Sequence, residues 1–187
     1  MATVDVLVEG FTSDDGKGDG NETTFCTMTL VRDGDIVMVV DPGTLKSQDI
    51  MKDALAKHGL KVKDVNTVFL THSHMDHFGS IGMFPGAKTV EFYGQWQEDR
   101  VEDRNNKLSD DIEVIETPGH AKTGLTLLVK TDKGTVAICG DVFWKENFPE
   151  KDPYADEPEE VEKSRKKVLE AADYIVPGHA GIYEIKK

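Results

Sequence analysis

The segment from Thr71 to Gly79, which reads Thr-His-Ser-His-Met-Asp-His-Phe-Gly, constrains this chain more than any other. It holds three of the six histidines within six consecutive positions. Three imidazoles and a carboxylate held close together are costly to bury unless a cation gathers them. The segment therefore predicts a metal site.

The position of this segment indicates how its side chains would converge. The apolar run Val68-Phe69-Leu70 directly before it is typical of a buried strand. The two-residue period of a strand would turn His72 and His74 to the same side. Asp76 and His77 follow where the chain turns off, so they would approach the same cavity from another direction. This arrangement suits a second metal ion a few ångströms from the first.

Length and composition predict one domain over residues 1–187. The chain is 38% hydrophobic, which is enough for a real core. Met1 to Glu9 alternates apolar and polar residues, so we expect neither a signal peptide nor a transmembrane segment. Cys26 and Cys139 lie in apolar, strand-like contexts and are expected to be buried, reduced thiols. Together these features fit a cytoplasmic protein.

The net charge excludes some partners. The formal charge is −13, and acidic residues are dense from Glu146 to Glu162. Such a surface repels polyanions and lacks the basic footprint of a nucleic-acid binder, so we expect no long nucleic acid as a partner, while short RNA stays open. Two divalent ions would nevertheless supply four positive charges locally, against two aspartates and one hydroxide. They would attract a small anionic substrate at close range.

Strand patterns and two helical patterns alternate along the chain. Expected strands are Thr3 to Val8, Thr23 to Arg32, Asp35 to Val40, Lys88 to Tyr93, Ile112 to Glu116, Leu125 to Lys130, Thr135 to Cys139 and Tyr174 to Val176. Ser13 to Gly20 is interpreted as the tip of a hairpin, with a small flap as the alternative to an idle turn. Lys145 to Ala155 lacks periodicity and is expected to be a loop.

Two amphipathic segments predict the helices. The first is capped by Ser47 and stops at Gly59, and the second runs from Glu157 to Ala172 with Pro158 in its first turn. Their expected inward faces comprise Ile50, Met51, Ala54 and Leu55 in the first, and Val161, Val168, Leu169 and Ala172 in the second. His58, at the end of the first helix, is interpreted as complementing the helix dipole, without a chemical role.

Three later positions repeat the pattern of a polar side chain directly after an apolar strand. They are His120 in Thr-Pro-Gly-His, Asp141 in Gly-Asp and His179 in Pro-Gly-His. Each follows a small or rigid turn residue that can deliver a side chain to a sheet edge. Alone, each is more typical of a surface loop. With the first segment they give five histidines and two aspartates, as many ligands as a bridged two-metal site needs.

These motifs, in this order, resemble the metallo-β-lactamase superfamily along essentially the whole chain. Within it, four segments are most similar to the metallo-β-lactamase domain-containing protein 1 group: Phe84-Pro85-Gly86-Ala87, Thr117-Pro118-Gly119-His120, Gly140-Asp141-Val142-Phe143 and Ile175-Val176-Pro177-Gly178-His179. The resemblance implies an α+β fold, an αββα sandwich of four layers, with the metals at one edge of the two sheets.

The resemblance also implies a role for each ligand. His72, His74 and His120 would hold the first metal, Asp76, His77 and His179 the second, and Asp141 would bridge the two. The cofactors would be two divalent ions, with zinc expected and iron or manganese as alternatives. A hydroxide shared by the metals would then attack an electrophilic carbon or phosphorus. Asp76 would also orient this nucleophile and take its proton.

Residues around the ligands are assigned on weaker patterns. Asp41, Thr71 and Thr123 are candidates for accepting the ring N–H that faces away from a metal, although Asp41 also fits a turn and Thr123 a strand start. Five residues that follow strand ends are candidates for the rim of a substrate groove, although such aromatics also pack over loops: Tyr93, Trp96, Trp144, Lys145 and Tyr183.

The leading functional hypothesis is a dinuclear, metal-dependent hydrolase acting on a small ester, thioester, lactone or phosphodiester. A metal-dependent phosphodiesterase or ribonuclease and a mononuclear non-haem iron persulfide dioxygenase are the alternatives. Dinuclear β-lactamases carry cysteine where Asp141 stands, which argues against antibiotic hydrolysis as the main activity. A binding module without catalysis is disfavoured because all seven ligand positions are filled. Substrate identity and oligomeric state are not encoded in these motifs.

Overall fold

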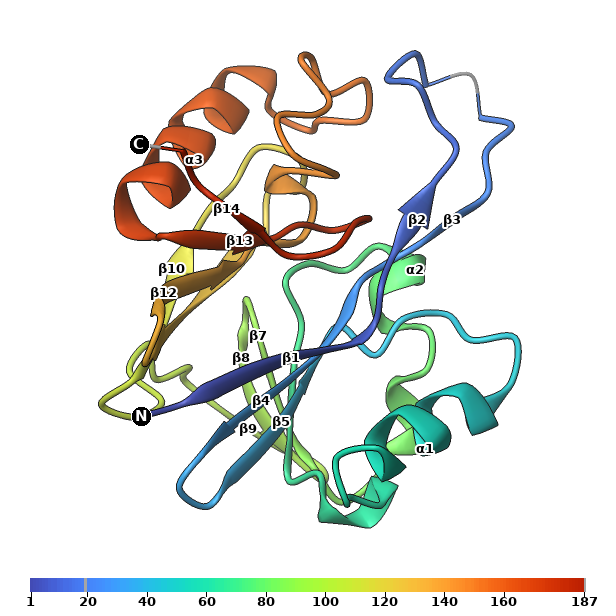
Figure 1. Cartoon of the computed structure of the whole chain (residues 1–187), viewed down its shortest axis with the longest axis vertical. Helices are drawn as coiled ribbons and strands as arrows, with labels where there is room; N and C mark the ends of the chain where they lie inside the picture. The colour runs from blue at the N-terminus through green and yellow to red at the C-terminus, as the bar shows by residue number, and fades with distance from the viewer. Residues whose placement is uncertain (19, 187) are drawn as a thin grey trace.

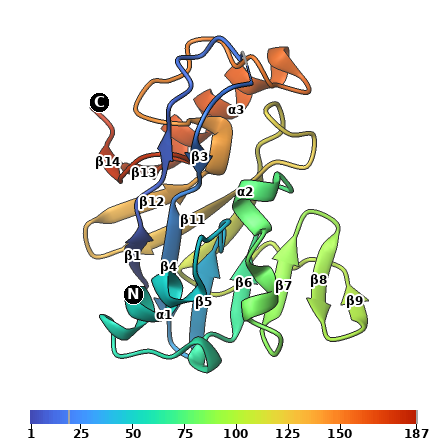
Figure 2. The same cartoon turned by 90° about the vertical axis from the view of Figure 1, so that its right-hand side faces the viewer.

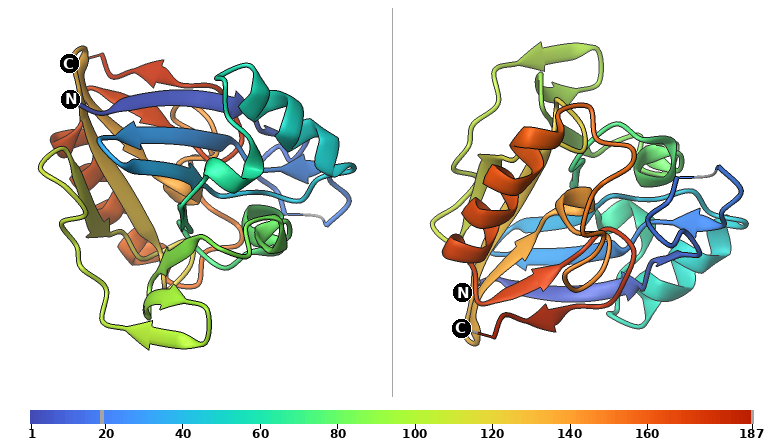
Figure 3. Two further views of the ribbon diagram at one scale, coloured as in Figure 1. Left: turned by 90° about the horizontal axis from the view of Figure 1, so that it is seen from below. Right: turned by 90° about the horizontal axis from the view of Figure 1, so that it is seen from above.

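Successive side chains of the central strands point to opposite faces of each sheet and pack into different hydrophobic cores. This alternation produces the layers of the molecule. The computed structural model describes residues 1–18 and 20–186. Two β-sheets pack face to face, with α1 against the outer face of one and α3 against the outer face of the other (Figures 1 and 3). The α+β sandwich implied by the sequence is therefore confirmed.

The first sheet is formed by strands from the N-terminal half. In the described residues its order is β1-β4-β5-β6-β7-β8-β9. The strands are β1 (Thr3–Val8), β4 (Met28–Asp33), β5 (Ile36–Val40), β6 (Thr67–Phe69), β7 (Lys88–Glu91), β8 (Gly94–Gln97) and β9 (Arg100–Glu102). Because β5, β6 and β7 pair in parallel, their carboxyl ends meet at one edge of the sheet.

The second sheet is formed by strands from the C-terminal half. Within the described residues its order is β10-β11-β12-β13-β14. These strands are β10 (Ile112–Glu116), β11 (Leu125–Thr131), β12 (Gly134–Ile138), β13 (Tyr174–Val176) and β14 (Tyr183–Glu184). β12 and β13 are parallel, so they also end at a common edge. A separate hairpin pairs β2 (Phe11–Thr12) with β3 (Thr24–Phe25).

The helices sit outside the sheets or at their ends. They are α1 (Gln48–Ala56), α2 (Met75–Phe78) and α3 (Pro158–Ala171), with the 3-10 helices η1 (Val62–Asp64), η2 (Ile81–Met83) and η3 (Gly140–Val142). The Ser47 side chain caps α1 by accepting from Asp49 N, as the sequence predicts. No helix in the part of the chain that the structure describes is both long enough and apolar enough to cross a membrane.

The central core lies between the sheets. Val40 and Phe69 from the first sheet face Leu127 and Ile138 from the second, and all are fully or nearly fully buried. One position along the strands, Val39 and Val68 point the other way and pack with Met51 and Leu55 of α1. Cys139 and Ile175 likewise meet Val168 of α3. Cys26 and Cys139 are buried free thiols, as expected.

Several expected elements differ from the structure in their details. The strand expected over Thr23 to Arg32 is interrupted, because Thr27 leaves the ladder to bond Gly178 O and Ala180 O. The strand expected over Lys88 to Tyr93 stops at Glu91, where the chain turns into β8. Ile50 is 40% exposed instead of facing inward. His58 lies beyond the end of α1, and its Nδ1 is 3.7 Å from Asp5 Oδ2.

The segment expected to be a hairpin tip does connect a pair of antiparallel strands. Residues 13–18 and 20–23, between β2 and β3, project beyond the sheets beside the loop that follows β12 (Figures 1 and 2). Asp19 lies outside the described residues. The two segments are thus neighbours in space, although more than a hundred positions separate them in sequence.

Candidate metal centre

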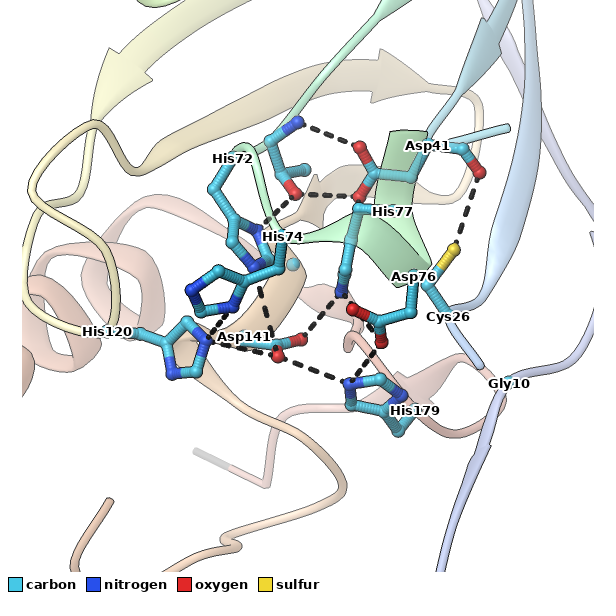
Figure 4. A network of polar contacts seen from close by, with 12 residues as sticks. Gly10, Cys26, Asp41, His72, His74, Asp76, His77, His120, Asp141 and His179 are labelled. Carbon is cyan, nitrogen blue, oxygen red and sulfur yellow. Dashed lines mark hydrogen bonds and ion pairs between the residues drawn. The ribbon is translucent and has the colours of Figure 1, made fainter. Parts of the chain in front are cut away.

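The predicted ligands all sit just beyond the carboxyl ends of strands. His72 follows β6, and α2 then carries Asp76 and His77. His120 lies between β10 and β11. Asp141 follows β12 within η3, and His179 follows β13. Because both sheets present these ends at the same side of the sandwich, segments far apart in sequence meet there (Figure 4).

The donor atoms form two adjacent groups among the described residues. His72, His74, His120 and Asp141 each offer an atom within 4.8 Å of the others, and Asp76, His77 and His179 form a second such group. Asp141 joins the groups, because its Oδ2 is 3.3 Å from His120 Nε2 and 3.2 Å from His179 Nε2, and its Oδ1 is 3.3 Å from His77 Nε2. The division matches the one implied by the resemblance.

Acceptors on the outer side fix the orientation of the buried imidazoles. His77 Nδ1 lies 2.8 Å from Asp41 Oδ2, and His120 Nδ1 lies 2.7 Å from Asp152 Oδ2. His179 Nδ1 is 3.0 Å from the carbonyl oxygen of Phe25. Carboxylate and carbonyl oxygens only accept, so each Nδ1 carries the hydrogen. Each Nε2 therefore presents its lone pair to the centre when the ring is neutral.

Asp41 organises the first-sheet side of the centre. Its backbone adopts a positive φ of 49°, which is uncommon for a residue with a side chain. In this conformation Oδ1 accepts from Thr71 N at 2.8 Å and Oδ2 accepts from Thr71 Oγ1 at 2.6 Å. Thr71 Oγ1 is in turn 3.1 Å from His72 Nδ1. One buried carboxylate thus positions both His77 and His72. The strained backbone of Asp41 lies at the residue that makes these contacts.

Charge in the centre is balanced around Asp141. Burial by itself raises the pKa of Asp141, but the imidazoles of His179, His77 and His120 outweigh it and hold the pKa well below its ordinary value. Burial conversely disfavours charge on His77, yet Asp141 and Asp41 raise its pKa well above the ordinary value. Both directions express one requirement: the buried carboxylate needs positive charge beside it, from protonated imidazoles or from metal ions.

Unpaired polar atoms test whether these residues fit a metal. His72 Nε2 is buried without a hydrogen-bond partner in the described part of the chain, and so are His77 Nε2 and Asp141 Oδ1, which lie 3.3 Å apart without hydrogen-bond geometry. Orphaned acceptors in the interior are costly unless something binds them. Burial also lowers the pKa of His72 well below its ordinary value, followed by the effect of the neighbouring His77. A neutral His72 presents a free lone pair, so the donor set fits divalent metal ions.

The sequence correctly predicts that His72 and His74 lie close together, but the structural reason differs from the one expected. His72 and His74 do approach, with ring centroids 4.6 Å apart. β6 however ends at Phe69, so the strand period does not align them; they lie on the loop that leads into α2. Asp41 and Thr71 contact histidines as expected. Thr123 has no hydrogen bond to these imidazoles among the described residues, because Asp152 occupies the outer side of His120.

Of the five expected rim residues, Trp144 alone lines the cavity that opens onto the centre. The cavity has a volume of about 390 Å³, counted over the residues that the structure describes. Tyr93 and Trp96 belong to the β7–β8 hairpin, where Trp96 Nε1 bonds Glu91. Tyr183 is in β14 and packs beneath α3. The ammonium of Lys145 bonds Thr12 O and lies over the Phe148 ring.

Sequence reasoning missed residues from two loops that border the centre. Asp152 is fully buried beside His120. The outer wall of the cavity includes Asp14, Glu22 and Tyr154, which come from the hairpin tip and the loop before α3. No periodicity or motif marked these positions. The turn-forming pairs that surround them predict loops, but not which side chains the loops present.

Comparisons with known proteins show which family and which fold the chain resembles. The profile of the Metallo-beta-lactamase superfamily matches residues 22–105. Metallo-beta-lactamase domain-containing protein 1 of Xenopus laevis is 31% identical, over 99% of this chain and 82% of that protein. A putative metallo-beta-lactamase from Thermotoga maritima shares the fold with a TM-score of 0.75, 20% identity and coverage of 98% and 99%. An N-acyl homoserine lactone hydrolase, with its product bound at the catalytic metal center, superposes with a TM-score of 0.71, 16% identity and coverage of 95% and 92%.

Proposed function

Because the chain belongs to the metallo-β-lactamase superfamily of metal-dependent hydrolases, we propose that it hydrolyses a small ester, thioester or lactone at a dinuclear zinc centre. One observation carries this proposal: two groups of donors face each other across Asp141, and most of their imidazoles are tied at Nδ1 so that Nε2 points inward. His72, His74 and His120 would hold one ion and Asp76, His77 and His179 the other, with Asp141 between them.

The metal ions and the side chains around them would then have separate roles in hydrolysis. When bound, the metal ions supply a water-derived nucleophile that is deprotonated near neutral pH, and they polarise the substrate oxygen. Asp76 lines the cavity, and its Oδ2 is 3.7 Å from His179 Nε2 and 3.8 Å from His77 Nε2. This carboxylate is placed to orient the nucleophile and to take its proton for delivery to the leaving group. Trp144 forms part of the cavity wall beside His120 and His179.

The cavity favours carbonyl substrates over phosphodiesters. Among the described residues that line it, none is a lysine or an arginine. A phosphodiester or an RNA backbone would therefore meet carboxylates outside the metal ions. The solved lactone hydrolase of the same fold supports the carbonyl reading by analogy. The free, buried thiols of Cys26 and Cys139 fit a reducing compartment, and we place the activity in the cytoplasm.

A reconstitution experiment tests the proposed function. The protein is loaded with zinc, iron or manganese, its metal content is measured, and each form is assayed with a thioester, a lactone, a phosphodiester and short RNA. We expect about two zinc ions per chain and hydrolysis of a carbonyl substrate. One iron per chain with sulfur-dependent oxygen uptake would instead establish the dioxygenase, and cleavage of RNA alone would establish the ribonuclease.

A pair of histidine variants controls this assay. His74→Ala removes a donor of the first group, so metal and activity should be lost together. His58→Ala changes a histidine on the far side of the first sheet, near Asp5, and should retain both. Activity that survives in His74→Ala would refute the assignment of this centre.

A further inference from the structure

The cavity wall opposite the predicted metals is acidic and aromatic. Asp14 and Glu22 come from the segment between β2 and β3, and Trp144 and Tyr154 come from the loop that follows η3. The Tyr154 hydroxyl is 2.9 Å from Asp14 Oδ2 and 3.2 Å from Glu22 Oε1, so it bridges the two carboxylates. The rings of Trp144 and Tyr154 stack with centroids 5.7 Å apart and planes inclined by 20°.

The residues of this wall are packed and hydrogen-bonded, and do not merely form a cluster of acids on a surface. Asp14 is 7% exposed, and its Oδ1 accepts from Gly16 N. Trp144 is 3% exposed and makes edge contacts with His120 and His179 at 6.3 and 6.5 Å. The stack therefore runs from the predicted ligands to the tyrosine that holds the two carboxylates.

Two buried polar atoms of the wall have no partner among the residues that the structure describes. They are Glu22 Oε2, an acceptor, and Trp144 Nε1, a donor. Buried atoms of this kind are costly unless a ligand or water satisfies them. Both residues also line the cavity, so a group that displaces part of the wall would meet an unsatisfied carboxylate oxygen and an unsatisfied indole N–H.

Nearby cations are engaged elsewhere. The ammonium of Lys145 bonds Thr12 O and lies 4.9 Å from the centroid of the Phe148 ring. Lys17 forms an ion pair with Asp15, which does not line the cavity. Carboxylates and stacked aromatic faces, beside lysines that are already paired, are surroundings that bind an ammonium group.

We propose that Glu22 and Asp14, with Tyr154 and Trp144, form a subsite for an ammonium group of the substrate. This inference rests on the proposed hydrolase function and names its substrate class: an ester, thioester or lactone whose other end carries a protonated amine. The charge of the metal ions alone favours an anionic substrate, as expected from the sequence. The wall adds the opposite preference at the distal end of the same cavity.

Two isosteric amides test the subsite without turnover. In N-(2-dimethylaminoethyl)butanamide the tail is an ammonium, and in N-(3-methylbutyl)butanamide a CH group replaces the NH. We expect calorimetric titration of the zinc-loaded protein to show about tenfold tighter binding of the amine, since hydrogen bonds to charged groups are worth about 1.5 kcal/mol or more. Equal affinity for the two amides, or no binding of the amine, would overturn the proposal.

Three variants separate recognition from the tethering of the loops. Glu22→Gln keeps an acceptor for Tyr154 but loses the charge, so the preference should fall to within about twofold. Glu150→Gln removes an exposed carboxylate from the loop that carries Tyr154, outside the cavity, and should keep the tenfold ratio. Tyr154→Phe cuts the bridge but leaves both carboxylates, so the amine should stay preferred. If Tyr154 only holds the two loops together and Glu22 does not recognise the ammonium group, the preference for the amine should survive Glu22→Gln and be lost in Tyr154→Phe.

Hydrolysis of the matching thioesters distinguishes this inference from the function on which it rests. Butanoyl thioesters of 2-(dimethylamino)ethanethiol and of 3-methylbutanethiol yield butyrate and a thiol that can be titrated. We expect a higher kcat/KM for the first after each value is divided by the rate of uncatalysed hydrolysis of the same thioester, and Glu22→Gln should erase that corrected difference. If neither is cleaved but the amides still differ, thioester hydrolysis is wrong and the subsite stands. If both are cleaved equally and the amides bind equally, the hydrolase stands and the subsite is wrong.

Discussion

Asp152 holds the imidazole of His120 from a loop that carries no recognisable motif. Its side chain is fully buried, and its Oδ2 is 2.7 Å from His120 Nδ1, while Oδ1 accepts from Tyr154 N at 3.0 Å. A carboxylate behind a ligand imidazole fixes the ring and increases its basicity. We therefore regard Asp152 as a positioning residue for the first group of donors.

Removing this carboxylate should weaken metal binding. Asp152→Ala leaves His120 free to rotate, so we expect a loss of roughly 10- to 100-fold in zinc affinity. Competition with a chromophoric chelator measures this value. Glu150→Ala removes an exposed acid from the same loop and serves as the control. Unchanged affinity in Asp152→Ala would show that His120 needs no such support.

Residues of the centre differ in how visible they are in sequence. His120, Asp141 and His179 each follow an apolar strand and a glycine, so a local pattern announces them. Glu22 meets Tyr154 because two loops that are 132 positions apart in sequence pack together, and Asp152 meets His120 across 32 positions. No local spacing encodes that contact. Their roles depend on tertiary proximity, which the sequence of one chain does not display.

At the scale of elements, α3 anchors the loop that approaches the centre. Arg165 is 8% exposed and lies on the same helix as the buried Val161 and Val168. Its Nε donates to Val142 O at 3.1 Å, Nη2 to Pro149 O at 2.6 Å and Nη1 to Glu150 O at 3.1 Å. The guanidinium also lies over the Phe143 ring, 5.4 Å from its centroid. One side chain thus joins α3 to both η3 and the loop.

Loss of this guanidinium should destabilise the fold. Arg165→Met keeps much of the apolar stem but leaves three carbonyls without their donor, and each such group costs about 1 to 3 kcal/mol. We expect the free energy of unfolding in urea to fall by about 3 kcal/mol or more. Lys166→Ala, at an exposed position on the same helix, should change it by less than about 0.5 kcal/mol. Similar stabilities for the two variants would contradict the anchoring role.

Helix and strand patterns predicted these elements unevenly. The apolar period identified α1 and α3, but it does not include Arg165, because only side-chain type, and not the carbonyls around it, is visible in sequence. β8 and β9 were missed for a related reason. The segment Gly94–Glu102 is largely polar and exposed, so it lacks the alternation of a half-buried strand. Pairing with β7 defines it as a hairpin.

Across the whole molecule, the sandwich brings separate strand ends to one edge. The resemblance of its His and Asp motifs to the metallo-β-lactamase superfamily implied this architecture, and the two sheets with outer helices confirm it. Loops were less predictable than layers. The cavity wall joins residues 14 and 22 to residues 144 and 154, and no periodic core pattern constrains those segments.

The centre also links distant parts of the chain through charge, so metal binding should stabilise the whole fold. A ligand that binds only the folded state at 100 times its Kd adds about 2.7 kcal/mol. For a chain of 187 residues this corresponds to a Tm higher by roughly 5 to 10 °C. Calorimetric scans before and after chelation at pH 7 measure the difference. Identical scans at full metal occupancy would contradict the coupling.

Acidification should remove the same stabilisation. Histidine ligates only as neutral imidazole, so protons compete with the metal as the pH falls through the imidazole range, near an ordinary pKa of about 6.5. Asp141 acts in the same direction, because it raises the pKa of His77, His120 and His179 against the effect of burial and so makes them hold protons more readily. The sign is therefore loss of metal, and of the added Tm, with decreasing pH. Metal content after dialysis at a series of pH values gives the titration. Full retention down to about pH 4 would rule out histidine as the principal ligand, since carboxylates alone titrate in that range.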